Sequence, residues 1–206
     1  MSNNLSKIAV LASGKGSNLD AILTAIKKGV CPVDVRLVLS DLADAGALRI
    51  ARDAHIPHVL HLDPKTYENR ACFDAACADA IESAGCHWVV LAGYMRILSN
   101  AFVARFPQRI VNIHPSLLPA FVGGDGVGDA LRYGVKITGC TVHLVNEVLD
   151  CGPILAQKTV AIHDDDDRYS LLQRMHEAEH QLYPQILADL VQKTLVFNGR
   201  TVKITG

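Results

Sequence analysis

An amide and an imidazole stand two residues apart in the stretch Ile-Val-Asn-Ile-His, residues 110–114, and together they could stabilise a negative charge and move a proton. The stretch is apolar, β-branched and followed by a proline, which cannot donate to a sheet ladder, so it predicts a buried strand ending at His114. Residues two apart on a strand face the same side, so Asn112 and His114 point together at a strand end, where open α/β sheets hold ligands. We interpret them as a catalytic pair. The alternative is two buried polar groups paired with backbone.

A glycine-rich loop, Ser-Gly-Lys-Gly-Ser-Asn at residues 13–18, lies between an apolar strand and a helical pattern. Backbone amides at the start of a helix, approached closely because glycine has no Cβ atom, suit a phosphate group. The loop has neither the spacing of a P-loop nor that of a dinucleotide site, so we expect a monophosphate. The alternative is a tight turn in which Ser17 or Asn18 caps the helix.

A third stretch, Gly-Tyr-Met-Arg-Ile-Leu at residues 93–98, surrounds one arginine with apolar side chains at the end of another strand. Apolar walls with a few polar anchors describe a pocket for a flat organic ligand. The alternative is that Met95 and Leu98 are ordinary core residues beneath a solvated Arg96.

Asp150, in Leu-Asp-Cys-Gly-Pro at residues 149–153, is the carboxylate that we expect beside His114. In that position it would favour the imidazolium form of His114 and accept or relay a proton. The alternative is an aspartate that starts a turn before Gly-Pro.

The remaining histidine clusters and the cysteines predict no metal site and no disulfide. Three histidines straddle the end of a helix and a strand, and two others share a helix face without the His-Glu-x-x-His order of zinc proteases. The six cysteines stand singly, as reduced, mostly buried thiols do. The histidines in question are His55, His58, His61, His176 and His180.

The composition favours small-molecule partners. The 206 residues can bury a substantial core, and 20 basic against 21 acidic residues give no sign of nucleic-acid or polybasic membrane binding. No apolar run approaches the roughly 20 residues of a membrane helix, and the N-terminal segment, residues 1–7, lacks the pattern of an export signal. We therefore expect a cytoplasmic protein.

The elements that must position these groups alternate between strands and helices, which predicts an α/β fold with a Rossmann-like, mostly parallel sheet and helices on both faces. We expect one domain over 1–206, with a phosphate-binding half at about 1–100 and a catalytic and ligand-binding half at about 101–206. The expected strands span 7–12, 33–40, 58–60, 88–91, 110–114, 137–145 and 154–160. Helices are expected through 19–26, 45–54, 66–84, 129–133 and 170–192, and a hairpin over 195–204.

Four motifs, taken together, resemble one known family. They are Ser13–Asn18, Gly93–Leu98, Asn-Ile-His-Pro-Ser-Leu-Leu-Pro at 112–119, and Leu-Asp-Cys-Gly-Pro at 149–153. The last two are similar to the formyl-folate transferase and hydrolase fold, and the Gly-Ser-Asn loop narrows the resemblance to the phosphoribosylglycinamide formyltransferases. The resemblance covers roughly residues 7–190.

The resemblance implies transfer of a formyl group from 10-formyltetrahydrofolate, the co-substrate, to the amine of glycinamide ribonucleotide, with no metal. It implies that Asn112, His114 and Asp150 are catalytic. Attack by an amine on a formyl group places negative charge on oxygen, and a donor to that oxygen is typically worth about 3–4 kcal/mol. Asn112 and a protonated His114 suit that role, and Asp150 suits proton transfer to the departing folate nitrogen, through water.

The resemblance also implies which residues bind the two substrates. The nucleotide would be held by Gly16, Ser17, Asn18, Arg109 and Glu179. The formyl-folate would be held by Arg70, Met95, Arg96, Ile97, Leu98, and by Val145, Asn146 and Glu147 of the following turn.

One segment departs from the family pattern after Leu-Leu-Pro. Val122 replaces a proline, Asp125 stands near an expected histidine, and Gly128 takes the place of an expected arginine. Because glycine loses much conformational entropy on ordering, we expect a mobile loop over 122–128 that does not touch the catalytic trio but lowers affinity or rate.

Two rival functions stay open at this point. A formyltetrahydrofolate hydrolase would use the same trio to pass the formyl group to water. A non-catalytic phosphometabolite-binding protein would keep the glycine-rich loop after the altered segment had disabled turnover. The sequence is compatible with a monomer or a homodimer.

Overall fold

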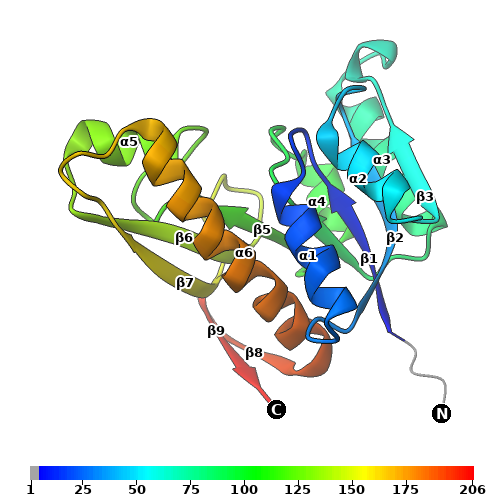
Figure 1. Ribbon diagram of the computed structural model, residues 1–206. Helices are drawn as coiled ribbons and strands as arrows, with labels where there is room; N and C mark the ends of the chain where they lie inside the picture. The colour runs from blue at the N-terminus through cyan, green and yellow to red at the C-terminus, as the bar shows by residue number, and fades with distance from the viewer. Residues whose placement is uncertain (1–4) are drawn as a thin grey trace.

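A seven-stranded sheet runs through the computed structural model, which describes residues 5–206 (Figure 1). Its strands lie in the order β3-β2-β1-β4-β5-β6-β7. Their bounds are β1 Ser6–Leu11, β2 Val33–Ser40, β3 His58–His61, β4 Trp88–Leu91, β5 Ile110–His114, β6 Ile137–Leu144 and β7 Ile154–Ala161. Residues 1–4, which belong to the expected domain and to the segment without an export pattern, lie outside the described residues.

The sheet is mostly parallel, as the sequence predicts. β3, β2, β1, β4 and β5 pair in parallel, whereas β6 pairs antiparallel with both β5 and β7. Parallel strands require a long crossover, which helices provide in the first part of the chain. β6 and β7 need only the turn at residues 145–153, so the chain reverses there.

Helices cover both faces of the sheet, which confirms the expected fold class (Figure 1). The apolar cluster on one face contains residues of α1, α2, α5 and α6, and that on the other contains residues of α3 and α4. β1 serves both faces by alternation, with Ile8 and Val10 in the first cluster and Ala9 and Leu11 in the second. The helices are α1 Ser17–Lys27, α2 Gly46–Asp53, α3 Arg70–Ser83, α4 Asn100–Arg105, α5 Gly126–Tyr133 and α6 Arg168–Gln192.

Two helices differ from the sequence prediction. α3 begins at Arg70 instead of residue 66, because Asn69 accepts a hydrogen bond from the Cys72 N–H at 3.0 Å and so caps the helix there. The preceding residues form a separate 3₁₀ turn at Pro64–Thr66. α4, capped by Ser99, was not expected, since six residues are too few for a helical period to stand out.

The glycine-rich segment is shorter than predicted, because α5 begins at Gly126 and not at residue 129. Asp125 caps this helix by accepting a hydrogen bond from the Gly128 N–H at 3.2 Å. A Cβ atom at Gly126 would lie 2.7 Å from the Pro115 carbonyl oxygen. The glycine therefore allows close packing against the segment that follows β5, and the expected irregular loop through residue 128 is wrong for its last three residues.

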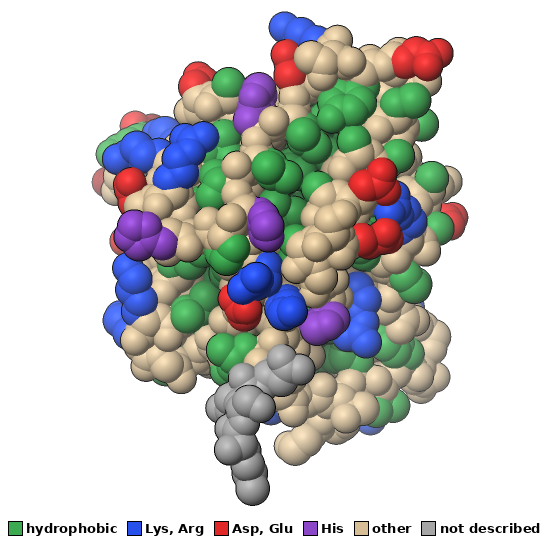
Figure 2. Space-filling view, turned by 90° about the vertical axis from the view of Figure 1, so that its right-hand side faces the viewer, with side chains coloured by type: hydrophobic (Ala, Val, Ile, Leu, Met, Phe, Trp, Pro, Cys, Tyr) green, Lys and Arg blue, Asp and Glu red, His purple; other side chains and the backbone are tan. Residues whose placement is uncertain are grey.

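The C-terminal hairpin is confirmed as a separate two-stranded sheet of β8 (Thr194–Asn198) and β9 (Thr201–Thr205). On the face shown in Figure 2, Lys and Arg side chains are interspersed with Asp and Glu and do not gather into one basic field. Within residues 5–206, no helix has the length and hydropathy needed to cross a membrane.

Candidate active site

The end of β5 brings the predicted trio together in a cavity of about 320 Å³. His114 Nδ1 lies 3.5 Å from Asp150 Oδ2, and the two side chains are 5% and 8% exposed. Asn112 and His114 both line the cavity, as expected from their spacing on the strand. The expectation that the carboxylate lies beside the imidazole is confirmed, so the simpler interpretation of Asp150 as only a turn residue is insufficient.

Asp150 is held in place by an unusual turn. Its φ angle is +50°, in the left-handed region, and its Oδ2 accepts a hydrogen bond from the Gly123 N–H at 3.1 Å. Gly152 is needed in the same turn, because a Cβ atom there would lie 1.6 Å from the Leu144 carbonyl oxygen. The Asp-Cys-Gly-Pro sequence thus folds the chain tightly enough to return the carboxylate to the end of β5.

The segment that departs from the family pattern contacts the trio, which corrects the expectation that it does not. Within residues 122–128, the Gly123 N–H donates to Asp150 Oδ2 at 3.1 Å. The carbonyl oxygen of Phe121, the residue just before this segment, lies 2.9 Å from the Nε2 atom of His114. Phe121 has a φ angle of +53°, so the backbone turns back toward the strand. Both contacts are made by backbone groups, which every residue type carries, so the sequence gives no indication of them.

His143 is a further member of the site that sequence reasoning missed. Its Nε2 lies 3.2 Å from Asn112 Nδ2 and 3.8 Å from Asp150 Oδ1, and its Nδ1 lies 3.0 Å from the Leu144 carbonyl oxygen. Burial lowers the pKa of His143, which favours the neutral ring. A neutral ring that donates from Nδ1 to Leu144 accepts from Asn112 at Nε2, and so fixes the orientation of the amide.

The stretch after β4 forms one wall of the same cavity, together with the turn after β6. Met95 is 72% exposed, so the alternative interpretation, in which Met95 is a core residue, is wrong. The Arg96 guanidinium lies 4.9 Å from the centre of the Phe73 ring and 4.0 Å from Asp41. The expected folate-binding residues that line the cavity are Met95, Arg96, Ile97, Leu98, Val145, Asn146 and Glu147.

Gly16 is the N-cap residue of α1, and no side chain binds the first N–H groups of this helix. Its φ angle is +84°, and a Cβ atom there would lie 2.7 Å from the Ala47 Cα atom. No side chain caps the helix, so the alternative in which Ser17 or Asn18 acts as the cap is wrong. Uncapped N–H groups at a helix start suit an anion.

Glu179 of α6 meets Asn18 of α1, as expected for two residues that bind one ligand. The Asn18 Nδ2 donates to Glu179 Oε2 at 2.9 Å, and Glu179 is 5% exposed. Burial raises the pKa of Glu179 to about 7, against the opposing effect of the Asn18 hydrogen bond. Among the described residues, Asn18 Oδ1 has no hydrogen-bond partner, which leaves a buried acceptor at this point.

Arg109 is not brought to the place expected of it, and Arg70 lies beside the folate wall without lining the cavity. Arg109 precedes β5, at the edge opposite to the ends of the parallel strands, and its guanidinium lies 4.9 Å from the centre of the Trp88 ring. It therefore does not reach the glycine-rich loop after β1. Arg70 does not line the cavity; its Nε lies 3.7 Å from Asp74, whose carboxylate accepts from the Ser99 N–H at 2.8 Å.

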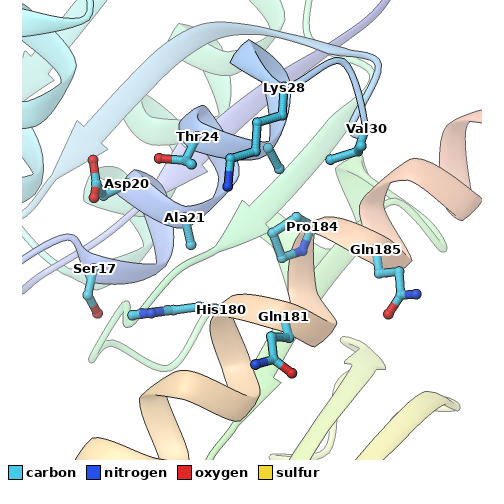
Figure 3. Close-up of a pocket in the computed structure, with 11 residues that line it drawn as sticks. Ser17, Asp20, Ala21, Thr24, Lys28, Val30, His180, Gln181, Pro184 and Gln185 are labelled. Atoms are coloured by element: carbon cyan, nitrogen blue, oxygen red, sulfur yellow. The ribbon is translucent and has the colours of Figure 1, made fainter.

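A second cavity of about 570 Å³ lies between α1 and α6 (Figure 3). Ser17 lies at the loop end of this groove, and His180 faces it from α6 (Figure 3). None of the trio lines it, so its size does not make it the reactive centre. Among residues 5–206, no three His, Cys, Asp or Glu side chains converge as metal ligands would.

The chain is similar in sequence and structure to known formyl transferases. Residues 6–187 match the family described as formyl transferase. The chain is 41% identical over 187 residues to the phosphoribosylglycinamide formyltransferase of Bacillus subtilis, covering 91% of this chain and 95% of that protein. Its structure is similar to the crystal structure of glycinamide ribonucleotide transformylase 1 from Symbiobacterium toebii, with a TM-score of 0.95. The two sequences are 43% identical, and the match covers 99% of this chain and 96% of that chain. It also matches the trifunctional purine biosynthetic protein adenosine-3 of Gallus gallus, at 41% identity over 98% of this chain and 20% of that protein.

Proposed function

This chain belongs to the formyl transferase family, within it to the phosphoribosylglycinamide formyltransferases, and we propose that Asn112, His114 and Asp150 carry out its reaction. The reaction transfers the formyl group of 10-formyltetrahydrofolate to the amine of glycinamide ribonucleotide in purine biosynthesis. The observation that carries the assignment of residues is the 3.5 Å contact between His114 Nδ1 and Asp150 Oδ2, inside the cavity that Asn112 also lines.

The cavity fits a folate in the chemistry of its walls. Apolar side chains stand at its rim with large exposed areas, including Met95, Ile97, Val148 and Leu149. A flat ring covers such side chains, and isolated polar groups on the same wall fix its orientation. We propose that these side chains, with the turn at 145–147, hold the formyl-folate next to the end of β5.

Asn112 supplies a donor for the oxyanion that develops when the amine attacks the formyl carbon. One N–H of its amide is directed at His143, so the other is available to the reacting oxygen. Losing one such donor typically costs about 3–4 kcal/mol in the barrier. Because His143 fixes the amide in advance, the donor needs no reorganisation during the reaction.

His114 and Asp150 handle the charge and the proton. An oxygen faces each nitrogen of the His114 ring, Phe121 at Nε2 and Asp150 at Nδ1, so the ring is oriented from both sides. The amine loses one proton on forming the new C–N bond, and the folate nitrogen gains one when its bond to the formyl carbon breaks. We propose that Asp150 accepts the first proton and returns it, directly or through water.

The nucleotide end lies at the start of α1. The uncapped N–H groups after Gly16, with the Ser17 hydroxyl, suit the phosphate, and the pair Asn18 and Glu179 suits hydroxyl groups of the sugar. Arg109 is left out of this set because of its position at Trp88. Arg70 is kept only as a residue near the folate wall.

We also propose one domain over 1–206, in which both of the expected halves contribute residues that bind the nucleotide. The phosphate loop belongs to the half at about 1–100 and the trio to the half at about 101–206. Glu179 crosses this division, because α6 packs on α1. We propose a cytoplasmic enzyme with small-molecule partners only, as a monomer or a homodimer.

The direct test is an assay with glycinamide ribonucleotide and 10-formyltetrahydrofolate, run beside a sample without the nucleotide. We expect formylated nucleotide and deformylated folate in equal amounts, and no product without the nucleotide. Formate released at the same rate in both samples would indicate a hydrolase instead. Nucleotide binding without turnover would indicate the non-catalytic binding protein.

A further inference from the structure

A single buried hydroxyl, that of Ser13, joins three loops. Its Oγ donates to Asp41 Oδ1 at 2.6 Å and accepts from the Met95 N–H at 3.0 Å. Its backbone N–H donates to the Gly93 carbonyl oxygen at 3.0 Å. Ser13 and Asp41 are 7% and 8% exposed, so these hydrogen bonds are shielded from water.

The topology explains why one residue reaches all three loops. Ser13 follows β1, Asp41 follows β2, and Gly93 follows β4, and β1 is the central strand of these three neighbours. Their carboxyl ends lie at one edge of the sheet, since all three are parallel. The Ser13 hydroxyl therefore lies between the loop after β1, on the nucleotide side, and the loop after β4, on the folate side.

On the nucleotide side, Ser13 is the first residue of the glycine-rich loop. The next residue, Gly14, accepts a hydrogen bond from the Ala47 N–H at 3.3 Å, and Gly16 packs against the same Ala47. A shift of Ser13 would thus move the backbone that leads into the start of α1.

On the folate side, Met95 and Arg96 form part of the cavity wall. The Met95 N–H donates to the Ser13 hydroxyl, and the Arg96 guanidinium lies 4.0 Å from Asp41 and 4.9 Å from the centre of the Phe73 ring. Asp41 thus contacts both the hydroxyl of Ser13 and the charged side chain of the wall.

We propose that Ser13 and Asp41 are positioning residues that couple the two substrates, so that binding of folate strengthens binding of nucleotide. A ligand that orders one loop also fixes the shared hydroxyl, and the second ligand then loses less conformational freedom. Linkage requires the effect to be the same in both directions. This inference rests on the proposed function, because it needs both loops to bind substrate.

The test measures nucleotide affinity by calorimetry with and without saturating tetrahydrofolate, which has no formyl group and so forms a ternary complex without reaction. We expect the wild-type Kd for glycinamide ribonucleotide to fall about fivefold or more when folate is bound, the usual size of such coupling. In Ser13→Ala the ratio should fall to about one, while each ligand alone binds within about threefold of wild type.

Two further variants separate coupling from structure. Asp41→Asn keeps an oxygen for the Ser13 hydroxyl but removes the charge facing Arg96, so its ratio should lie between those of wild type and Ser13→Ala. It is also the variant that decides the question if Ser13→Ala does not fold. Ser40→Ala is the control, and its ratio should stay at the wild-type value. Ser40 is the buried last residue of β2, and among the described residues its hydroxyl makes a hydrogen bond only with the Leu42 N–H, at 3.1 Å.

A wild-type ratio of one, or a wild-type ratio retained in Ser13→Ala or in a folded Asp41→Asn, overturns the coupling. So does a loss of both affinities in Ser13→Ala with the ratio retained, which indicates a structural role only. These results differ from failure of the proposed function, in which the wild type binds no nucleotide or forms no formylated product. That outcome removes both proposals together.

Discussion

The two ends of the site differ in how far their polar groups are already paired. At the end of β5, Asn112 is bound by His143, and the nitrogens of His114 face Phe121 and Asp150. At the start of α1, the helix has no side-chain cap, and Asn18 Oδ1 is buried without a partner among the described residues. The reactive end is organised before substrate arrives, whereas the nucleotide end is not.

This difference follows from what each end must do. A donor for a short-lived oxyanion stabilises it best when no rearrangement is needed, so neighbours fix Asn112 in advance. A binding end gains affinity when its free donors and acceptors meet a ligand that satisfies them. The comparison therefore predicts that substitutions at the reactive end act on turnover, and those at the nucleotide end on binding and stability.

The largest expected effect is that of Asp150→Asn on turnover. The amide keeps the volume of the carboxylate but cannot accept the proton, so kcat should fall by about 10²–10⁴. The KM for glycinamide ribonucleotide should change little, because Asp150 is not at the nucleotide end. Steady-state kinetics measure both, with Asp164→Asn, a fully accessible carboxylate, as the control. A near-normal kcat would remove Asp150 from the mechanism and abolish the contrast.

The second prediction concerns the pH dependence of stability at the nucleotide end. Burial raises the pKa of Glu179 from 4.5 to about 7, so the folded protein holds a proton that the unfolded chain releases. Stability from this group is therefore fully present below pH 4.5 and is lost as the pH rises through about 7, by on the order of 3 kcal/mol.

Glu179→Gln should remove this loss, because an amide keeps the hydrogen bond to Asn18 without ionising. Its free energy of unfolding, from denaturant titration, should exceed that of wild type at pH 8, and the two should converge near pH 4.5. The exposed neighbour Glu177→Gln is the control and should follow wild type throughout. Parallel curves for wild type and Glu179→Gln would mean that Glu179 is ionised in the folded protein across this range.

The sequence predicted the reactive strand well because its evidence is local. Asn112 and His114 belong to one strand, so the two-residue period alone places them on one side. Asp150 was found through its motif, and the structure confirms its contact with His114. By contrast, His143 enters the site through antiparallel pairing, which sets it opposite Asn112. Its own strand showed the right alternation but not the neighbour it would face.

The wrong expectations also have physical causes. Arg109 stands next to a catalytic strand in sequence, but it lies at the amino end of that strand and packs on Trp88. The segment at residues 122–128 contacts Asp150 through the Gly123 backbone N–H, and a backbone contact of this kind is not indicated by residue type. Both errors arise from the path of the chain in space, which side-chain chemistry alone does not determine.

The third prediction tests whether the reactive end depends on a fixed amide. His143→Leu leaves the Asn112 N–H without its acceptor, so the amide can rotate, and kcat should fall about tenfold, the cost of roughly one lost hydrogen bond. The KM values should stay near wild type. His143→Gln, which retains an acceptor oxygen, should recover most of the lost kcat. Equal activity of both variants would indicate that His143 only fills space.

The smallest expected effect lies in the segment that departs from the family pattern, and it asks how firmly that segment is fixed. Asp125 is paired with Arg132 at 3.1 Å and Arg168 at 2.5 Å. Both arginine side chains are more than half exposed and Asp125 is 35% exposed, so these ion pairs are solvated and contribute little. Arg168→Ala should therefore lower kcat by less than about threefold, and less at high salt, because screening already weakens the pair. Kinetics at low and high salt measure this, with the distant Lys136→Ala as the control. A loss of kcat of tenfold or more would mean that the ion pairs of Asp125 hold the segment against the trio, and not the hydrogen bonds of Phe121 and Gly123. The geometry of the reactive end would then depend on surface charges as well as on its own paired polar groups.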